Sequence, residues 1–446
     1  MSSDSSFKKI ARNIGIFGGA QCFTVAAALV RAKVVALLIG PAGIGLNALL
    51  NTISNFIASL SGLGISSSAV RSLSEVTDDE VLRGEVRRVR RWGMLTAAFG
   101  GAITLLLAPI LSRYYMEDYS HTTSFALLAI AVASITLTGC EMAVMKSSRR
   151  VRQLAQCTIV TAILSVVTVV PFIYYWRMEG IVWALVISSL LVALYTLQLG
   201  YRLLPTPGLW SLPVSKGREI WHRSRPMLVL GMAFVASGML STGADLLIQS
   251  VLATTASLSV LGFYRAGIQL GITYTGLIFT AIINDLYPRL SAVHQDTERR
   301  NLLVDRQIVV LLCIVVPFTM IFVALVPYLI PLLFSHEFDA ICPMVQAMAW
   351  ALPLQAIALP IGCLPLALGK SLHFFVLELI SWTLFALFVL GSYFYGGLSA
   401  IGMAIVWSRL IDLLIVVAFC YKNYGYRFKW QSMRRTHDDT TSNTHA

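Results

Sequence analysis

Long apolar stretches recur along almost the whole chain, from Ile14 to Tyr421, and no other feature constrains its fold as strongly. A helix needs about 20 consecutive apolar residues to cross the hydrocarbon layer of a membrane. Twelve such stretches fit the sequence, so we predict an all-α membrane protein with twelve transmembrane helices. The expected spans are Ile14–Ile39, Gly45–Val70, Trp92–Leu111, Phe125–Met145, Leu154–Tyr175, Ile181–Leu199, Met227–Leu252, Gly262–Leu286, Ile308–Phe334, Ile341–Leu368, Leu372–Phe394 and Ile401–Phe419.

Basic residues gather in alternate gaps between these spans. If the N-terminus lies in the cytoplasm, most of the 34 Lys and Arg residues fall in cytoplasmic segments. Such an excess sets the orientation of membrane proteins. We therefore predict a multi-pass protein of the bacterial inner membrane with both termini in the cytoplasm.

The formal net charge of +12 would suggest a nucleic-acid partner in a soluble protein. Here the positive residues lie in short loops that face anionic lipid head groups. We therefore expect membrane lipids as partners and no nucleic acid. The seven cysteines lie in or beside spans without paired spacing, so the sequence predicts neither a disulfide framework nor a metal site.

The segments outside the membrane are too short for a catalytic domain. No phosphate-binding loop occurs, because Gly362 to Lys370 has the wrong spacing for one. The external loops are short and carry no paired carboxylates, which disfavours a membrane glycosyltransferase or polymerase. We expect a protein that is not an enzyme and needs no cofactor.

The two halves of the chain look like copies in the same orientation. In each half an external turn leads through a polar-striped helix to a basic cytoplasmic segment: Arg71 follows Gly45 by 26 residues, and Arg289 follows Gly262 by 27. This weak repeat predicts two six-helix bundles. The expected segments are 1–201 for the N-terminal bundle, 202–225 for a cytoplasmic connection, 226–421 for the C-terminal bundle and 422–446 for a basic, polar cytoplasmic tail.

Several motifs resemble those of one protein family. The run from Lys33 to Leu46, KVVALLIGPAGIGL, resembles the first-span signature of bacterial O-antigen flippases and is similar to that of enterobacterial common antigen flippases. The segments 286–291, 334–338 and 371–378 agree in order. One departure is that many relatives carry an acid shortly after the tryptophan of span ten, whereas Leu-Pro-Leu-Gln follows Ala351 here, after Trp350.

This resemblance implies a multidrug/oligosaccharidyl-lipid/polysaccharide exporter: two six-helix bundles forming a V, with alternating access. The implied activity is to flip undecaprenyl-diphosphate-linked oligosaccharide repeat units, of O-antigen or a related surface polysaccharide, from the cytoplasmic to the periplasmic leaflet. The implied partners are this lipid-linked substrate, a polysaccharide polymerase and a chain-length regulator. The alternative is a cation-coupled multidrug antiporter on the same fold.

A substrate of this kind needs cations for its diphosphate. A charge at mid-membrane costs about 2.5–3.5 kcal/mol on insertion scales, so charged residues there should face water or a partner. Arg31 continues a polar stripe, whereas Lys33 lies about 200° around the helix but belongs to the family motif. Both remain candidates for binding the diphosphate. The alternative is that the side chains snorkel to the membrane surface or form ion pairs. Arg265 and Arg409 are further candidates, although an interfacial anchor and a pair with Asp412 explain them equally simply.

Polar stripes could line a path for sugars. Asn47, Asn51 and Asn55 are spaced to share one helix face, and Gln269 and Thr273 recur in the second half. Amide and hydroxyl groups suit sugar hydroxyls, while hydrogen bonding between helices is the competing explanation.

Four acids lie in or at the ends of spans: Glu141, Asp245, Asp285 and Glu378. A carboxylate that moves between water and a buried environment can take up and release protons, so these are candidates for ion coupling. Structural pairing with a cation is the alternative. Prolines concentrate in spans nine and ten, where we expect the helices to flex.

Overall fold

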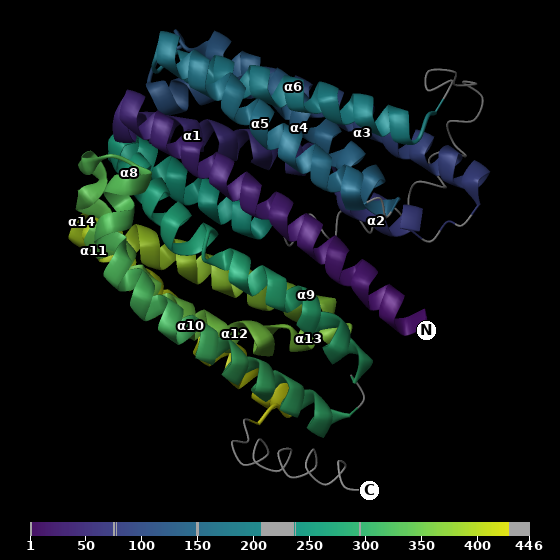
Figure 1. Cartoon of the computed structure of the whole chain (residues 1–446). Helices are drawn as coiled ribbons and strands as arrows, with labels where there is room; N and C mark the ends of the chain where they lie inside the picture. Colours follow the sequence, from purple (N-terminus) through teal and green to yellow (C-terminus); the bar gives the residue numbers. More distant parts are fainter. Residues whose placement is uncertain are drawn as a thin grey trace, which may run out of the picture. The chain divides into compact units, whose positions relative to one another are not determined.

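The computed structural model describes residues 2–74, 76, 78–148, 151–206, 236, 238–293 and 296–427. Within these ranges all regular structure is helical (Figure 1). The helices of the first part are α1 Ser2–Ser61, α2 Ile65–Ser74, α3 Asp79–Met116, α4 Thr122–Ser147, α5 Val151–Trp176 and α6 Gly180–Leu203. Those that follow are α8 Leu258–Ile268, the π-helix η2 Gln269–Thr273, α9 Gly276–Ala292, α10 Thr297–Leu333, the 3₁₀-helix η3 His336–Ile341, α11 Cys342–Ala349, α12 Ala351–Gly362, α13 Leu364–Ala367 and α14 Ser371–Tyr424.

These helices account for the expected membrane spans. Among the described residues, seven helices are long and apolar enough to cross a membrane, or eight if a bent pair counts as one span. Two of the seven are double length, because α1 and α14 break at Gly40 and Gly397 and so each supplies two expected spans. The helical residues 238–255 match the second part of the expected seventh span, of which residues 227–235 and 237 lie outside the described structure. The helices α8 to α9 match the eighth. The chain is therefore a multi-pass membrane protein.

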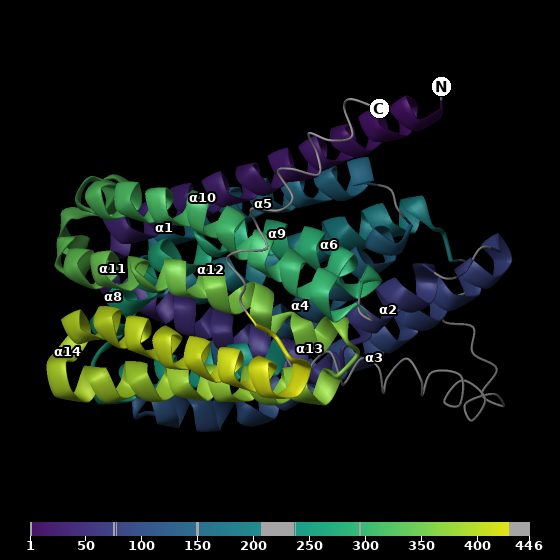
Figure 2. The ribbon, with the colours of Figure 1, turned by 90° about the horizontal axis from the view of Figure 1, so that it is seen from below.

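The breaks in α1 and α14 have nearly the same backbone geometry. Gly40 has φ 71° and ψ −164°, and Gly397 has φ 66° and ψ −158°. This region is essentially restricted to glycine because a Cβ would clash with the backbone. Figure 2 shows the two halves of α14 side by side, and Arg409 Nη1 of the second half donates to Ser381 Oγ of the first at 3.3 Å. Each glycine thus joins two spans with almost no loop.

The chain forms two compact units. The first comprises Met1–Gly262 with Leu333–Ser335, and the second Phe263–Leu332 with His336–Ala446. In the first unit, α4 packs against α3 and α6, and α5 packs against α1 and α6. A buried cluster that includes Ile65, Val86, Val89 and Val144 joins α2, α3 and α4.

In the second unit, α11, α12 and α13 pack along α14. Its core brings together Leu290, Val304, Leu364 and Val416 from α9, α10, α13 and α14. The expected connection 202–225 and tail 422–446 lie mostly outside the described residues. The arrangement in two six-helix bundles stays a prediction.

Expected spans eight and ten are irregular helices. Span eight contains the π-helical turn 269–273. Span ten is divided at Trp350, where His336–Ala349 and Ala351–Ala367 meet at a bend of 41°. By contrast, α10 stays continuous although it contains Pro317, Pro327 and Pro331. The bend therefore lies in span ten, while motion of either span stays a prediction.

Candidate functional site

Arg31 belongs to α1, and its side chain reaches α5. Its Nη1 donates to Ser165 Oγ at 2.7 Å, and the contact is partly buried. A guanidinium carries several N–H donors, which suit the oxygens of a phosphate. Lys33 is also half-buried in α1. Both therefore remain candidate cations.

The asparagine stripe of α1 forms a continuous chain of hydrogen bonds. Asn51 Nδ2 donates to the backbone oxygen of Asn47 at 2.7 Å and to its Oδ1 at 3.0 Å. Asn55 Nδ2 donates to the backbone oxygen of Asn51 at 2.7 Å, and Asn55 is exposed. The three amides therefore share one face, as the spacing predicts, and are held in fixed orientations by their own helix.

A buried polar contact that sequence reasoning missed lies beside this stripe. Gln249 Nε2 donates to Thr52 Oγ1 at 2.9 Å, and Gln249 is 0% exposed. It joins α1 to the helical residues 238–255. Gln249 Oε1 has no hydrogen-bond partner within the described structure. A glutamine inside an apolar span was the available signal, because such residues usually bond to a neighbouring helix.

The polar residues of span eight lie at the π-helical turn. Gln269 Nε2 donates to the Tyr274 hydroxyl at 2.6 Å, and Thr273 is exposed. Single π-helical turns inside α-helices are frequent at functional sites. Arg265 is half-buried in α8, one turn before Gln269. The second unit thus presents a distorted polar helix, which periodicity alone did not predict.

Arg409 is surrounded by groups of its own unit. Its Nη1 lies 3.8 Å from Asp412 Oδ2, which confirms the predicted pair within one helix. Its guanidinium carbon also lies 5.3 Å from the ring centroid of Phe385, at cation–π distance. Nearby, Trp382 Nε1 donates to Glu378 Oε2 at 3.0 Å. The contacts of Arg409 link the two halves of α14, whereas the Glu378 contact lies within the first half.

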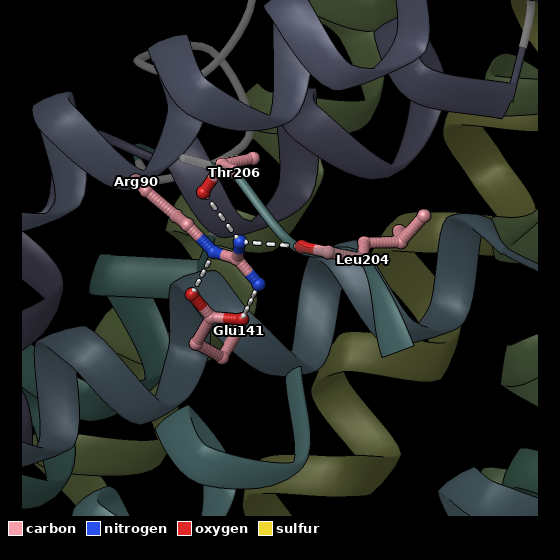
Figure 3. Close-up of polar contacts among 4 residues, drawn as sticks. All are labelled: Arg90, Glu141, Leu204 and Thr206. Carbon is pink, nitrogen blue, oxygen red and sulfur yellow. Dashed lines mark hydrogen bonds and ion pairs between the residues drawn. The ribbon is translucent and has the colours of Figure 1, made fainter. Parts of the chain in front are cut away.

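Glu141 forms a buried ion pair with Arg90 (Figure 3). Arg90 Nε and Nη2 donate to its two carboxylate oxygens at 2.6 and 3.0 Å. Arg90 Nη1 donates to the Leu204 carbonyl at 2.8 Å and to Thr206 Oγ1 at 2.9 Å. The guanidinium also lies 4.2 Å from the Tyr201 ring centroid. One arginine therefore ties together α3, α4 and the segment after α6.

The contacts of Glu141 favour a structural role for this residue over a role in ion coupling. Both its oxygens are engaged, and Arg90 and Glu141 are 2% and 1% exposed. Asp245 is half-buried in residues 238–255. Asp285 lies in α9, but its side chain is outside the described part of the structure. Ion coupling through any of these acids stays a prediction.

Comparison with known proteins identifies one matching family. Residues 34–343 match the model of a family described as polysaccharide biosynthesis protein. No curated protein matches the sequence.

Several solved structures resemble the chain in fold. The lipid II flippase MurJ in an inward closed conformation matches with a TM-score of 0.71 and 14% identity, covering 91% of this chain and 87% of that one. An inward-facing multidrug resistance MATE family transporter of the MOP superfamily matches with a TM-score of 0.68 and 14% identity, covering 95% and 96%. A MOP superfamily transporter from Pyrococcus furiosus matches with a TM-score of 0.56 and 14% identity, covering 95% and 93%. The predicted all-α membrane fold class is thereby confirmed.

Proposed function

This chain belongs to the polysaccharide biosynthesis protein family, and from that premise we propose that it is a flippase for lipid-linked oligosaccharides. It turns undecaprenyl-diphosphate-linked repeat units, of O-antigen or a related surface polysaccharide, from the cytoplasmic to the periplasmic leaflet. The observation that carries the proposal is the family match over residues 34–343, joined to a membrane fold similar to that of a lipid II flippase.

The polar groups of both units suit the parts of such a substrate. Arg31, held at one nitrogen by Ser165, supplies a cation for the diphosphate. The amides of Asn47, Asn51 and Asn55 and the hydroxyl of Thr273 suit sugar hydroxyls. The prenyl tail needs no polar contact and stays in lipid.

The membrane itself supports the outward direction. We place the protein in the inner membrane with both termini in the cytoplasm, because the basic residues favour that orientation. Moving an anionic head group outward across an inside-negative membrane is favourable by about 2.3 kcal/mol per charge per 100 mV. Flipping can therefore proceed without obligatory proton exchange, and no chemical step or cofactor is required. A polymerase and a chain-length regulator would act on the exposed product.

The alternative is a cation-coupled multidrug antiporter, which the similarity to MATE family transporters favours. Such a protein needs a carboxylate that is free to exchange ions. Glu141 is the clear acid within a span of the first half, and Arg90 engages both its oxygens. This pairing makes the antiporter the weaker proposal.

Deletion of the gene in its native host separates the two functions. A flippase predicts loss of the surface polysaccharide and accumulation of its lipid-linked repeat unit inside the cell. An antiporter predicts an intact polysaccharide and greater sensitivity to organic cations. Intact polysaccharide with no accumulated repeat unit would exclude the flippase.

A further inference from the structure

A cavity of about 300 Å³ lies within the first compact unit. It is bounded by the end of α1, the start of α2, the middle of α4 and the helix of residues 238–255. Its volume is at the lower end of the roughly 300–1,000 Å³ that small-molecule sites occupy. The lining residues are Ala58, Ser59, Gly62, Gly64, Ser66, Ser67, Ile135, Thr136, Gly139, Cys140, Gly238, Met239 and Thr242.

The cavity is lined by hydroxyls, glycines and the apolar groups of Ala58, Ile135, Cys140 and Met239, and its described lining carries no charge. Hydroxyl groups reach it from α2, α4 and residues 238–255, and none of its described lining residues is Lys, Arg, His, Asp or Glu. A diphosphate would need a cation here, and an organic cation would need a carboxylate or an aromatic face. The lining therefore suits a neutral, hydroxyl-rich ligand.

The hydroxyls are arranged so that they can both accept and donate. Thr136 Oγ1 donates to the Val132 carbonyl at 2.9 Å and Thr242 Oγ1 to the Gly238 carbonyl at 3.1 Å, so both oxygens keep lone pairs for a ligand. Ser66 and Ser67 are exposed, so their hydroxyls are accessible to a ligand. A sugar hydroxyl likewise donates and accepts, which matches such a set.

The glycines create the space. A Cβ on Gly238 would meet no heavy atom within 4 Å, and one on Gly139 would meet Ser66 Cβ at 3.7 Å. The turn before α2 holds Leu63 at φ 48° and Gly64 at φ 66°, and it directs Ser66 and Ser67 to the cavity. A left-handed leucine is uncommon, and such strain often accompanies a functional site.

We propose that this cavity is a glycan subsite that holds one or two neutral sugar residues of the transported lipid. The inference rests on the proposed function and adds to it the part of the chain that contacts the sugar. The diphosphate lies elsewhere, since its cations are not part of this lining.

Cysteine protection tests occupancy directly. Full-length Ser67→Cys protein in nanodiscs is treated with maleimide, and labelling is followed by peptide mass spectrometry. The probe is the lipid-linked oligosaccharide extract of the native host, compared with the same extract after mild acid has released the glycan. We expect only the intact extract to slow labelling, while Ser120→Cys in the turn after α3 is unaffected. Protection by neither extract would overturn the subsite.

Two kinds of variant test its role in transport. Gly238→Leu fills the cavity, and Gly84→Leu is the matched control, because a Cβ at either glycine meets nothing within 4 Å. The double variant Ser66→Ala with Ser67→Ala removes two hydroxyl groups that would bond to the sugar and adds no volume. It should slow flipping about tenfold. We expect Gly238→Leu to abolish flipping of the intact extract and Gly84→Leu to retain it. Wild-type rates in both sets of variants would overturn the proposal, whereas a wild-type chain that flips nothing would overturn the proposed function instead.

Discussion

Arg90 and Glu141, which are 51 residues apart in sequence, form a bidentate ion pair that is almost completely buried. Gly200 faces the pair closely enough that a Cβ there would collide with the Glu141 carboxylate. Removing one partner of a buried pair leaves an uncompensated charge. The pair is therefore a structural element of the first unit, joining α3, α4 and α6.

Glu141→Gln should lower the stability of the purified protein by about 3–5 kcal/mol, because Arg90 is left buried without its counter-charge. Thermal unfolding in detergent measures the change. Glu85→Gln is the control, since Glu85 pairs with Arg88 at 2.7 Å on a more exposed face, where such pairs contribute about 0–1 kcal/mol. A stable Glu141→Gln protein that has lost proton-dependent transport would instead make Glu141 an ion-coupling residue.

Gly397→Ala should destabilise the protein by about 1–3 kcal/mol, because alanine is strained in the glycine-only backbone region. Gly391→Ala is a matched control in the same helix: a Cβ at either position meets nothing within 4 Å, but only Gly397 has a positive φ. We expect Gly391→Ala to be neutral or slightly stabilising in thermal unfolding. Equal stability of the two variants would show that the turn tolerates another backbone geometry.

Gly45 and Gly262 lie against each other in the first unit, and both should resist substitution. A Cβ on Gly45 would collide with the Leu258 carbonyl, and one on Gly262 with the Pro41 carbonyl. Backbone atoms cannot move aside as a side chain does, so either alanine variant should unfold at a lower temperature. Gly276→Ala, with open space at its Cβ, should not. Wild-type melting of Gly262→Ala would contradict the close approach.

Arg31→Ala should weaken binding of an undecaprenyl diphosphate lipid by about tenfold to a hundredfold, because a charge-assisted hydrogen bond is worth about 1.5–3 kcal/mol. Binding of the lipid to protein in nanodiscs measures this. Ser165→Ala removes the Arg31 anchor and keeps the charge, so its effect should be smaller. If both variants only lower the melting temperature and leave binding unchanged, Arg31 has a structural role.

The sequence predicted the elements better than their contacts. The apolar stretches located the spans, because each span needs about the same length of apolar chain whatever it packs against. They also grouped Asn47, Asn51 and Asn55, since helical spacing is a local property. The partner of Glu141 could not be predicted, because Arg90 reaches it only through the packing of α3 on α4.

Local irregularity escaped prediction for a related reason. The π-helical turn at Gln269 depends on the backbone of one turn and leaves no mark on hydrophobic periodicity. The lone polar residue Gln249 gave a signal, but only the folded unit shows that Thr52 accepts its hydrogen bond. The cavity near Ser66 likewise forms only when four helices are in place.

Leaflet exposure of a glycan is the most direct measurement of the proposed flippase activity. The purified chain is reconstituted in liposomes with the lipid-linked oligosaccharide extract placed in one leaflet, and a membrane-impermeant lectin reports its arrival in the other. We expect exposure that is faster than in protein-free liposomes and slower with Arg31→Ala. Exposure at the protein-free rate, with proton-driven efflux of an organic cation from the same liposomes, would exclude the flippase and favour the antiporter.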